Sequence, residues 1–271
     1  MVFNSQEFLI FFPVVVLIYF VIPRKIRYIW LLIASYYFYM SWNVKYSLLL
    51  AVSTAVTYLC GLMIGKYTAK GNTRGAKWSV ALTFVINLGI LAVFKYANFI
   101  LASVSAIASF LGLNPVESRL DVLLPVGISF YTFQALSYVI DVYRGEIAPE
   151  RNILKYALFV SFFPQLVAGP IERSVNLMPQ IQNLHNIKVW NFDRIKDGFF
   201  MMMWGPFQKI VIADRASAIV ENVFDNYTQF GFVEILAALF LFAIQIYCDF
   251  GGYSNIAIGA AQVMGINLMQ N

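Results

Sequence analysis

Long apolar runs separated by short loops make up most of this chain. Of its 271 residues, 60% are hydrophobic and only 12% are charged. A soluble domain is nearer one-half apolar and one-quarter charged, so this composition indicates an integral membrane protein. Because lipid offers no partners for backbone polar groups, apolar segments of this kind are expected to cross the bilayer as helices. We therefore predict an all-α fold, a polytopic membrane helical bundle.

The positions of the apolar runs predict about seven to nine membrane segments, some of them short, kinked or re-entrant. The clearest runs are Phe8–Ile22, Tyr28–Trp42, Tyr46–Ile64, Leu123–Val142, Ile153–Gly169 and Phe232–Phe250. Between the third and fourth of these, Trp78–Phe94 and Tyr96–Leu113 form either two short spans or one long kinked element that contains Lys95. Hydrophobic periodicity does not decide between these two arrangements.

The basic residues are concentrated in short loops. Arg24, Lys25 and Arg27 follow the first apolar run, and the loop Lys66–Lys77 contains basic residues and no acid. This distribution follows the positive-inside rule and predicts that both loops are cytoplasmic. The formal net charge of +5 therefore implies no nucleic-acid partner, and membrane lipid is the expected environment.

The segment Asp214–Gly231 has a different character from the apolar runs. Acidic, basic and amide side chains occupy one helical face, and apolar side chains recur on the other. The apolar positions are Ile219, Val220, Val223, Phe224 and Tyr227. This pattern predicts an amphipathic helix at the membrane surface or against the bundle, and not a span.

The run Gln245–Ile266 places a carboxylate, tyrosines and amide groups in a segment that is otherwise apolar enough for the membrane. An ionisable group at membrane depth is costly, so Asp249 is expected to face a polar interior or a water-filled cavity. Later in the same run, Ala257, Ala261 and Gly265 are spaced by four residues. That spacing predicts a small-residue face suited to close helix contact.

The run Ser161–Arg173 contains two prolines within an apolar element. Pro164 and Pro170 each lack a backbone donor, so the helix is expected to break at both positions. Gln165 follows the first break, where freed backbone carbonyls need partners. Broken helices at membrane depth occur where they line a cavity or are buried in protein. The run is therefore either the wall of a substrate tunnel or a kinked helix end that leads into a loop.

Other polar residues have more ordinary interpretations. Asp141 and Arg144 lie three residues apart and are expected to pair locally on a helix surface. His185, the one histidine, lies in a polar stretch and is interpreted as a surface-loop residue. A single histidine excludes a His-rich metal centre, and no metal site is predicted. The two cysteines, Cys60 and Cys248, are interpreted as small buried apolar residues.

Aromatic residues accumulate at the end of the second apolar run. They are Tyr36, Tyr37, Tyr39 and Trp42. Aromatic side chains with a polar tip are enriched where membrane and water meet. We therefore interpret these four as anchors at the membrane interface.

Several of these motifs, taken in order, resemble the membrane-bound O-acyltransferase (MBOAT) family in its bacterial branch of alginate, peptidoglycan and other polysaccharide O-acetylases. The segments that carry the resemblance are Met1–Ser5, Leu124–Arg144, Ser161–Arg173, Gly205–Arg215 and Gln245–Ile266. They extend along essentially the whole chain. The resemblance implies a multi-pass protein of the bacterial inner membrane. It also assigns tunnel or scaffold positions to Pro164, Gln165, Gly169, Pro170, Asp249, Gly252 and Tyr253.

The resemblance further implies the chemistry and the co-substrates. Members transfer an acyl group from a thioester, such as acetyl-coenzyme A or an acyl carrier protein, to a hydroxyl acceptor, and an envelope acetyltransferase is an expected partner. No other cofactor is implied. A histidine of near-neutral pKa is the family's general base, because an alcohol is a poor nucleophile. That histidine follows the Asp249–Ser254 segment and lies beyond Asn271. We therefore expect residues 1–271 to form a single incomplete membrane domain, without a catalytic residue and inactive alone.

Two other functions fit the same residues. A transporter would also use helix breaks at Pro164 and Pro170 and a buried Asp249 along its substrate path. A non-catalytic membrane scaffold that docks a partner acyltransferase would need neither transport nor transfer. Loss of substrate uptake on Asp249→Asn would favour the transporter, and partner binding unaffected by that change would favour the scaffold.

Overall fold

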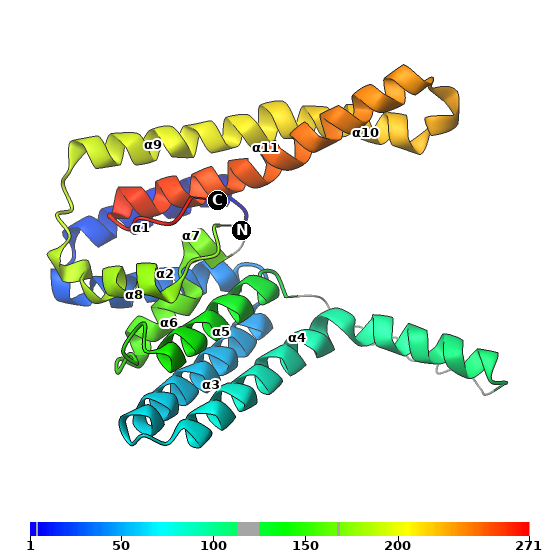
Figure 1. Cartoon of the computed structure of the whole chain (residues 1–271). Helices are drawn as coiled ribbons and strands as arrows, with labels where there is room; N and C mark the ends of the chain where they lie inside the picture. Colours follow the sequence, from blue (N-terminus) through cyan, green and yellow to red (C-terminus); the bar gives the residue numbers. More distant parts are fainter. Residues whose placement is uncertain (4, 113–124, 167–168, 271) are drawn as a thin grey trace.

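The computed structural model describes residues 1–3, 5–112, 125–166 and 169–270, and these residues contain helices and no strand. The all-α prediction is therefore confirmed. The helices are α1 (Gln6–Val21), α2 (Arg27–Met40), α3 (Val44–Ala69), α4 (Thr73–Phe110), α5 (Ile128–Arg144), α6 (Ile153–Ser161), α7 (Phe163–Leu166), α8 (Ser174–Gln182), α9 (Phe192–Pro206), α10 (Asp214–Asp225) and α11 (Phe232–Met264). Figure 1 shows α9 and α11 antiparallel along one side, α3, α4 and α5 on the opposite side, and the remaining helices mostly between them.

Three of these helices, α3, α4 and α11, are long and apolar enough to cross a membrane. The shorter α1 is also apolar, and it begins where the Ser5 hydroxyl accepts a hydrogen bond from the Phe8 backbone N–H at 3.3 Å. These features support an integral membrane protein. The number of spans, predicted as seven to nine, stays a prediction.

The region between residues 73 and 110 is one continuous helix, so the two-span alternative is wrong. At 38 residues and about 1.5 Å per residue, α4 is roughly 57 Å long, well beyond the ~30 Å hydrocarbon core. Figure 1 shows it bent, with its second half directed away from the bundle. Only the first half carries a regularly buried face, Ala76, Ser79, Thr83, Asn87 and Leu91. On that face, Asn87 accepts a hydrogen bond from the Ser53 hydroxyl of α3 at 2.6 Å.

Glycines bring α9 and α11 into backbone contact. A Cβ on Gly259 would lie 2.4 Å from the carbonyl oxygen of Gly198, and a Cβ on Gly205 would lie 2.5 Å from that of Gly252. Only glycine permits so close an approach of two helices. The small-residue prediction was right about Ala257 and Ala261, which are fully buried. Gly265 ends α11 at a φ of 89°, and a Cβ there would lie 2.4 Å from the Cγ2 of Ile187 and 3.0 Å from the Arg194 guanidinium of α9, so close contact holds for the glycine as well.

The amphipathic segment is α10 followed by a 3₁₀ turn, Tyr227–Gln229. Its buried residues are Ala216, Val220 and Val223, and α10 packs against α11. Ile219 and Tyr227 are exposed, at 56% and 63%. The packing of α10 accounts for the buried positions, and the placement of this helix at the membrane surface stays a prediction.

Candidate functional site

The break in the element 153–169 occurs between α6 and α7, at Phe162. In a continuous helix the Phe163 N–H would donate to the Phe159 carbonyl. Here the Phe163 N–H donates to the hydroxyl of Ser35 in α2 at 3.1 Å. The Phe159 carbonyl accepts instead from the Gln134 side chain of α5 at 2.7 Å. The freed backbone groups thus find side-chain partners, as a buried break requires.

The four predicted residues around this break are all buried. The Gln134 side chain that donates to Phe159 also donates to the side-chain oxygen of Gln165, at 3.2 Å. Gly169 folds back on the break, with its N–H donating to the Gln165 carbonyl at 3.2 Å. A Cβ there would lie 2.6 Å from the Cα of Gln165. Residues 167 and 168 lie outside the described residues. This dense packing fits a scaffold role for Pro164 and Gln165, and the tunnel wall stays a prediction.

Asp249, on α11, belongs to a charged cluster that is centred on Lys209. Its carboxylate lies 2.7 Å from the ammonium of Lys209, which also lies 2.9 Å from the carboxylate of Asp214 at the start of α10. The Lys209 side chain is 18% exposed and that of Asp249 is 39% exposed. The costly ionisable group is therefore compensated by a cation between two carboxylates.

Lys209 was missed by the sequence analysis, although it lies in the Gly205–Arg215 segment. Pro206 lacks a backbone N–H, and after it the chain forms a π-helix, Phe207–Ala213, before α10 begins. Within that stretch, Gln208 also reaches α11, where its side-chain oxygen accepts from Asn255 at 2.6 Å. Short π-helical stretches often occur at functional sites. A lysine in an otherwise apolar run is the sequence signal by which Lys209 could have been found.

The predicted site residues form two sets, one in and just after α7 and one on α11, and aromatic side chains connect the two sets. Tyr253 lies under the Lys209 ammonium, with 5.7 Å between Nζ and the ring centroid. On the other side, the Tyr253 ring centroid is 6.3 Å from that of Phe3. Phe3 in turn stacks on Phe38 at 5.7 Å, and Phe38 lies 5.7 Å from Phe163 of α7. An apolar layer therefore lies between the charged cluster and Gln165. The third α11 residue, Gly252, lies against Gly205 of α9, and its role in the tunnel or the scaffold stays a prediction.

Two local predictions were wrong. Asp141 does not pair with Arg144; it accepts a hydrogen bond from the buried Ser174 hydroxyl of α8, and Arg144 pairs with Glu146 at 3.8 Å. A contact between helices thus prevails over the local i,i+3 spacing. Tyr39 is not an interface anchor, because it is 1% exposed and its hydroxyl donates to the Val126 carbonyl at 3.1 Å.

Two other predictions agree with the structure. His185 is exposed, on a 3₁₀ turn. Cys60 and Cys248 are buried and unbridged. Within the described ranges, no group of three or more His, Cys, Asp or Glu side chains lies together as a metal site would require.

A buried carboxylate holds the chain after α11 against the segment before α8. Glu172 is fully buried and accepts hydrogen bonds from the Met269 backbone N–H and from the Asn176 side chain, the latter at 2.7 Å. Burial raises the pKa of this carboxyl above its usual value, against the opposing effect of those hydrogen bonds. Glu172 lies outside the long apolar helices.

This raised pKa predicts a pH effect on stability. The folded state binds the Glu172 proton more tightly than the unfolded state does. Stability therefore increases as the pH falls from the folded pKa toward 4.5, the ordinary pKa of a glutamate carboxyl. Above the folded pKa the buried charge costs stability. The thermal midpoint of the wild-type protein, relative to that of Glu172→Gln, should therefore rise between pH 7.5 and 5. Parallel midpoint profiles for the two proteins would contradict this.

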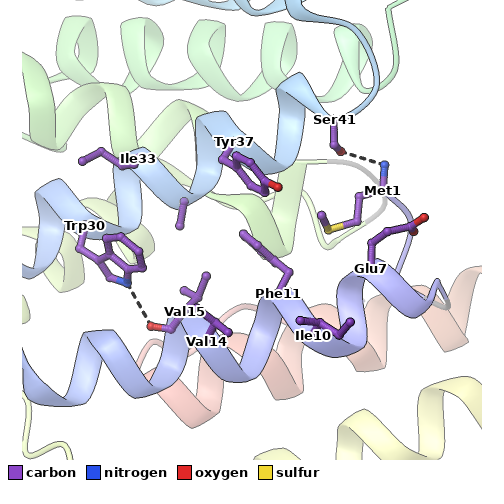
Figure 2. A pocket seen from close by; sticks show the side chains of 11 residues that line it. Met1, Glu7, Ile10, Phe11, Val14, Val15, Trp30, Ile33, Tyr37 and Ser41 are labelled. Atoms are coloured by element: carbon purple, nitrogen blue, oxygen red, sulfur yellow. Dashed lines mark hydrogen bonds between the residues drawn. The ribbon is translucent and has the colours of Figure 1, made fainter.

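A separate groove lies between α1 and α2 (Figure 2). Its volume is about 690 Å³, and most of its lining is apolar. The indole N–H of Trp30 donates to the Val15 carbonyl at 3.0 Å, and near the other end the Met1 ammonium donates to the Ser41 hydroxyl at 2.9 Å. None of the seven predicted tunnel or scaffold residues lines this groove. It therefore gives no support to the predicted tunnel.

Known proteins are similar to this chain over its whole length. No family model matches the chain. The chain is 39% identical over its whole length to a protein named probable alginate O-acetylase from Pseudomonas aeruginosa, of which it covers 51%. It is 33% identical over its whole length to the peptidoglycan O-acetyltransferase of Helicobacter pylori, covering 55% of that protein. The chain is more distantly similar to the teichoic acid D-alanyltransferase of Bacillus subtilis. The two are 23% identical over 54% of this chain, and the match covers 37% of that protein.

These matches indicate a class of protein, because the relatives are named as transferases of acetyl or D-alanyl groups to alginate, peptidoglycan or teichoic acid. The predicted resemblance is confirmed, because all three kinds of relative are members of the membrane-bound O-acyltransferase family and the chain is homologous to them. The chain spans about half the length of the curated relatives that it matches most fully.

Proposed function

We propose that this chain forms part of a membrane O-acyltransferase that transfers an acetyl group from a thioester donor to hydroxyls of a cell-envelope polysaccharide. The observation that carries this proposal is the similarity of the whole of residues 1–271 to alginate and peptidoglycan O-acetylases. Acetyl-coenzyme A and an acyl carrier protein are the two candidate donors. The names of the relatives favour acyl transfer over the transporter and scaffold alternatives.

The proposed setting is the bacterial inner membrane, crossed several times. Three long apolar helices and the basic loops beside them support this placement. A thioester donor made in the cytoplasm and a polymer outside would meet at such a protein, and an envelope acetyltransferase is the proposed partner. Lys209 would offset part of the negative charge of Asp214 and Asp249, which lowers the cost of an ionised Asp249 at membrane depth.

We further propose that residues 1–271 transfer no acetyl group by themselves. Deprotonating a hydroxyl near neutral pH needs a general base of matched pKa, commonly a histidine. The sequence contains one histidine, His185, and its side chain is exposed on the 3₁₀ turn Leu184–Asn186. Purified 1–271 should therefore leave alginate unacetylated when supplied with acetyl-coenzyme A or acyl carrier thioester. Turnover by 1–271 alone that is lost on heat denaturation would contradict this, and His185→Ala would show whether that turnover uses the histidine.

A chimera tests the proposed function itself. Residues 1–271 replace the aligned half of the Pseudomonas aeruginosa relative, and the remaining half of that protein is kept. If the chain is an acyltransferase segment, membranes that contain the chimera should acetylate alginate. Membranes with the parent protein and with no transferase give the upper and lower limits of the assay. An assay with peptidoglycan as acceptor shows whether this half influences the choice of polymer.

A further inference from the structure

A hollow with basic walls lies at one end of the bundle, away from the charged cluster on α11. Two 3₁₀ helices, Arg24–Ile26 after α1 and Leu184–Asn186 after α8, contact each other there. Together with Lys155 of α6 they enclose about 270 Å³. The loop that holds Arg24 is one of the two predicted to be cytoplasmic. On that prediction, the hollow would lie at the cytoplasmic surface of the membrane.

The polar lining of this hollow is cationic. It includes the three cations Arg24, Lys25 and Lys155 beside Tyr28, Gln182 and His185, and it includes no acidic side chain. Within the described parts of the chain, the salt bridges involve other residues, so these three cations are not paired with a carboxylate. Glu150 is the acidic group that contacts the lining, through a hydrogen bond that it accepts from Gln182 at 2.5 Å.

Lys155 is held in place within the hollow. Its ammonium donates to the Gln182 backbone carbonyl at 3.2 Å and lies 5.7 Å from the centroid of the Tyr28 ring. An ammonium has three donors, so further donors stay available for a ligand. Arg24 and Lys25 are exposed beside it. A fixed central cation with two adaptable cations at the rim is an arrangement suited to an anion with several oxygens.

We propose that this hollow binds a phosphate group, and that the phosphate belongs to the headgroup of an anionic membrane lipid. Basic pockets between helix ends at a membrane surface bind such headgroups, because the local positive charge meets the phosphate where acyl chains can stay in the bilayer. A phosphate of this kind would take the place of the missing carboxylates around Lys155. This inference does not depend on the proposed transferase function.

The test measures binding by the 271-residue protein in a non-ionic detergent. The probes are dihexanoyl phosphatidylglycerol, dihexanoyl phosphatidylcholine and inorganic phosphate, each titrated calorimetrically. The variants are Arg24→Gln/Lys25→Gln and Lys155→Met. The matched control is Lys66→Gln/Lys70→Gln, which removes two exposed charges from the other basic loop. Thermal midpoints of all variants show whether they are folded.

Phosphatidylglycerol should bind more tightly than phosphatidylcholine, and the Kd should rise at least about tenfold in Arg24→Gln/Lys25→Gln. The control variant should bind like the wild type. If inorganic phosphate binds as tightly as the lipid and responds to the same variants, the phosphate proposal holds and the source is a free phosphate. Equal losses in the control and the pocket variants would overturn the proposal, and so would unchanged binding in the pocket variants or no binding of either phosphate probe.

Discussion

Replacing Gly259 with alanine is expected to destabilise the protein by about 3 kcal/mol, the upper end of the usual cost of overpacking. The added Cβ would lie 2.4 Å from the Gly198 carbonyl oxygen and 2.8 Å from the Cγ of Met202, both on α9. The closest of these atoms is backbone, so relief requires moving α9 away from α11. The thermal midpoint in detergent should fall sharply, together with the fraction of monodisperse protein.

Gly89→Ala is the matched control for this experiment. Gly89 is an exposed glycine of α4, and a Cβ there would meet no atom within 4 Å. Its substitution should leave the thermal midpoint unchanged or raise it slightly, because alanine favours a helix over glycine by about 1 kcal/mol. If Gly259→Ala and Gly89→Ala gave the same midpoint, the backbone contact between α9 and α11 would not exist as described.

Lys209→Met is expected to have the largest effect on activity. It removes the cation shared by Asp214 and Asp249 and leaves two carboxylates close to one another. Because the cluster is only partly buried, the expected loss of stability is about 1–2 kcal/mol, between the cost for an exposed pair and that for a buried pair. In the chimera we expect acetyl transfer to fall at least about tenfold, since Asp249 and Tyr253 would lose the group that positions them.

Lys209→Arg distinguishes positioning from general destabilisation. Arginine keeps the positive charge and can contact two carboxylates, although its geometry differs. Transfer should therefore be restored in part by Lys209→Arg and not by Lys209→Met, at matched amounts of membrane-inserted protein. Equal transfer by Lys209→Met and the wild type would show that the cluster serves structure alone.

Much of the helical framework could be predicted from the sequence, because apolar length and basic loops depend on local composition. The predicted run Phe8–Ile22 corresponds closely to α1, and Tyr28–Trp42 to α2. The sequence did not decide whether the α4 region is one helix or two, since Lys95 is compatible with either a loop or a helix. Only the structure shows that the helix continues through it.

The site could be predicted in part. Asp249 was identified because a carboxylate in an apolar run is conspicuous, whatever the tertiary structure. Its partner was not, because Lys209 lies forty positions earlier and reaches Asp249 through a π-helical stretch and the packing of α9 on α11. Asp141 shows the same limit: local spacing favoured Arg144, whereas the folded chain supplies Ser174.

The O-acetyl content of alginate from cells that carry the chimera tests the central claim most directly. It is measured by the O-acetyl signals of the isolated polymer, beside cells with the parent Pseudomonas aeruginosa protein and cells with neither. We predict acetylated alginate from the chimera and a marked loss when Lys209→Met is introduced. A chimera that accumulates in the membrane as a monodisperse protein, in amounts equal to the parent, and yet leaves alginate unacetylated would contradict the assignment of residues 1–271 to an O-acyltransferase.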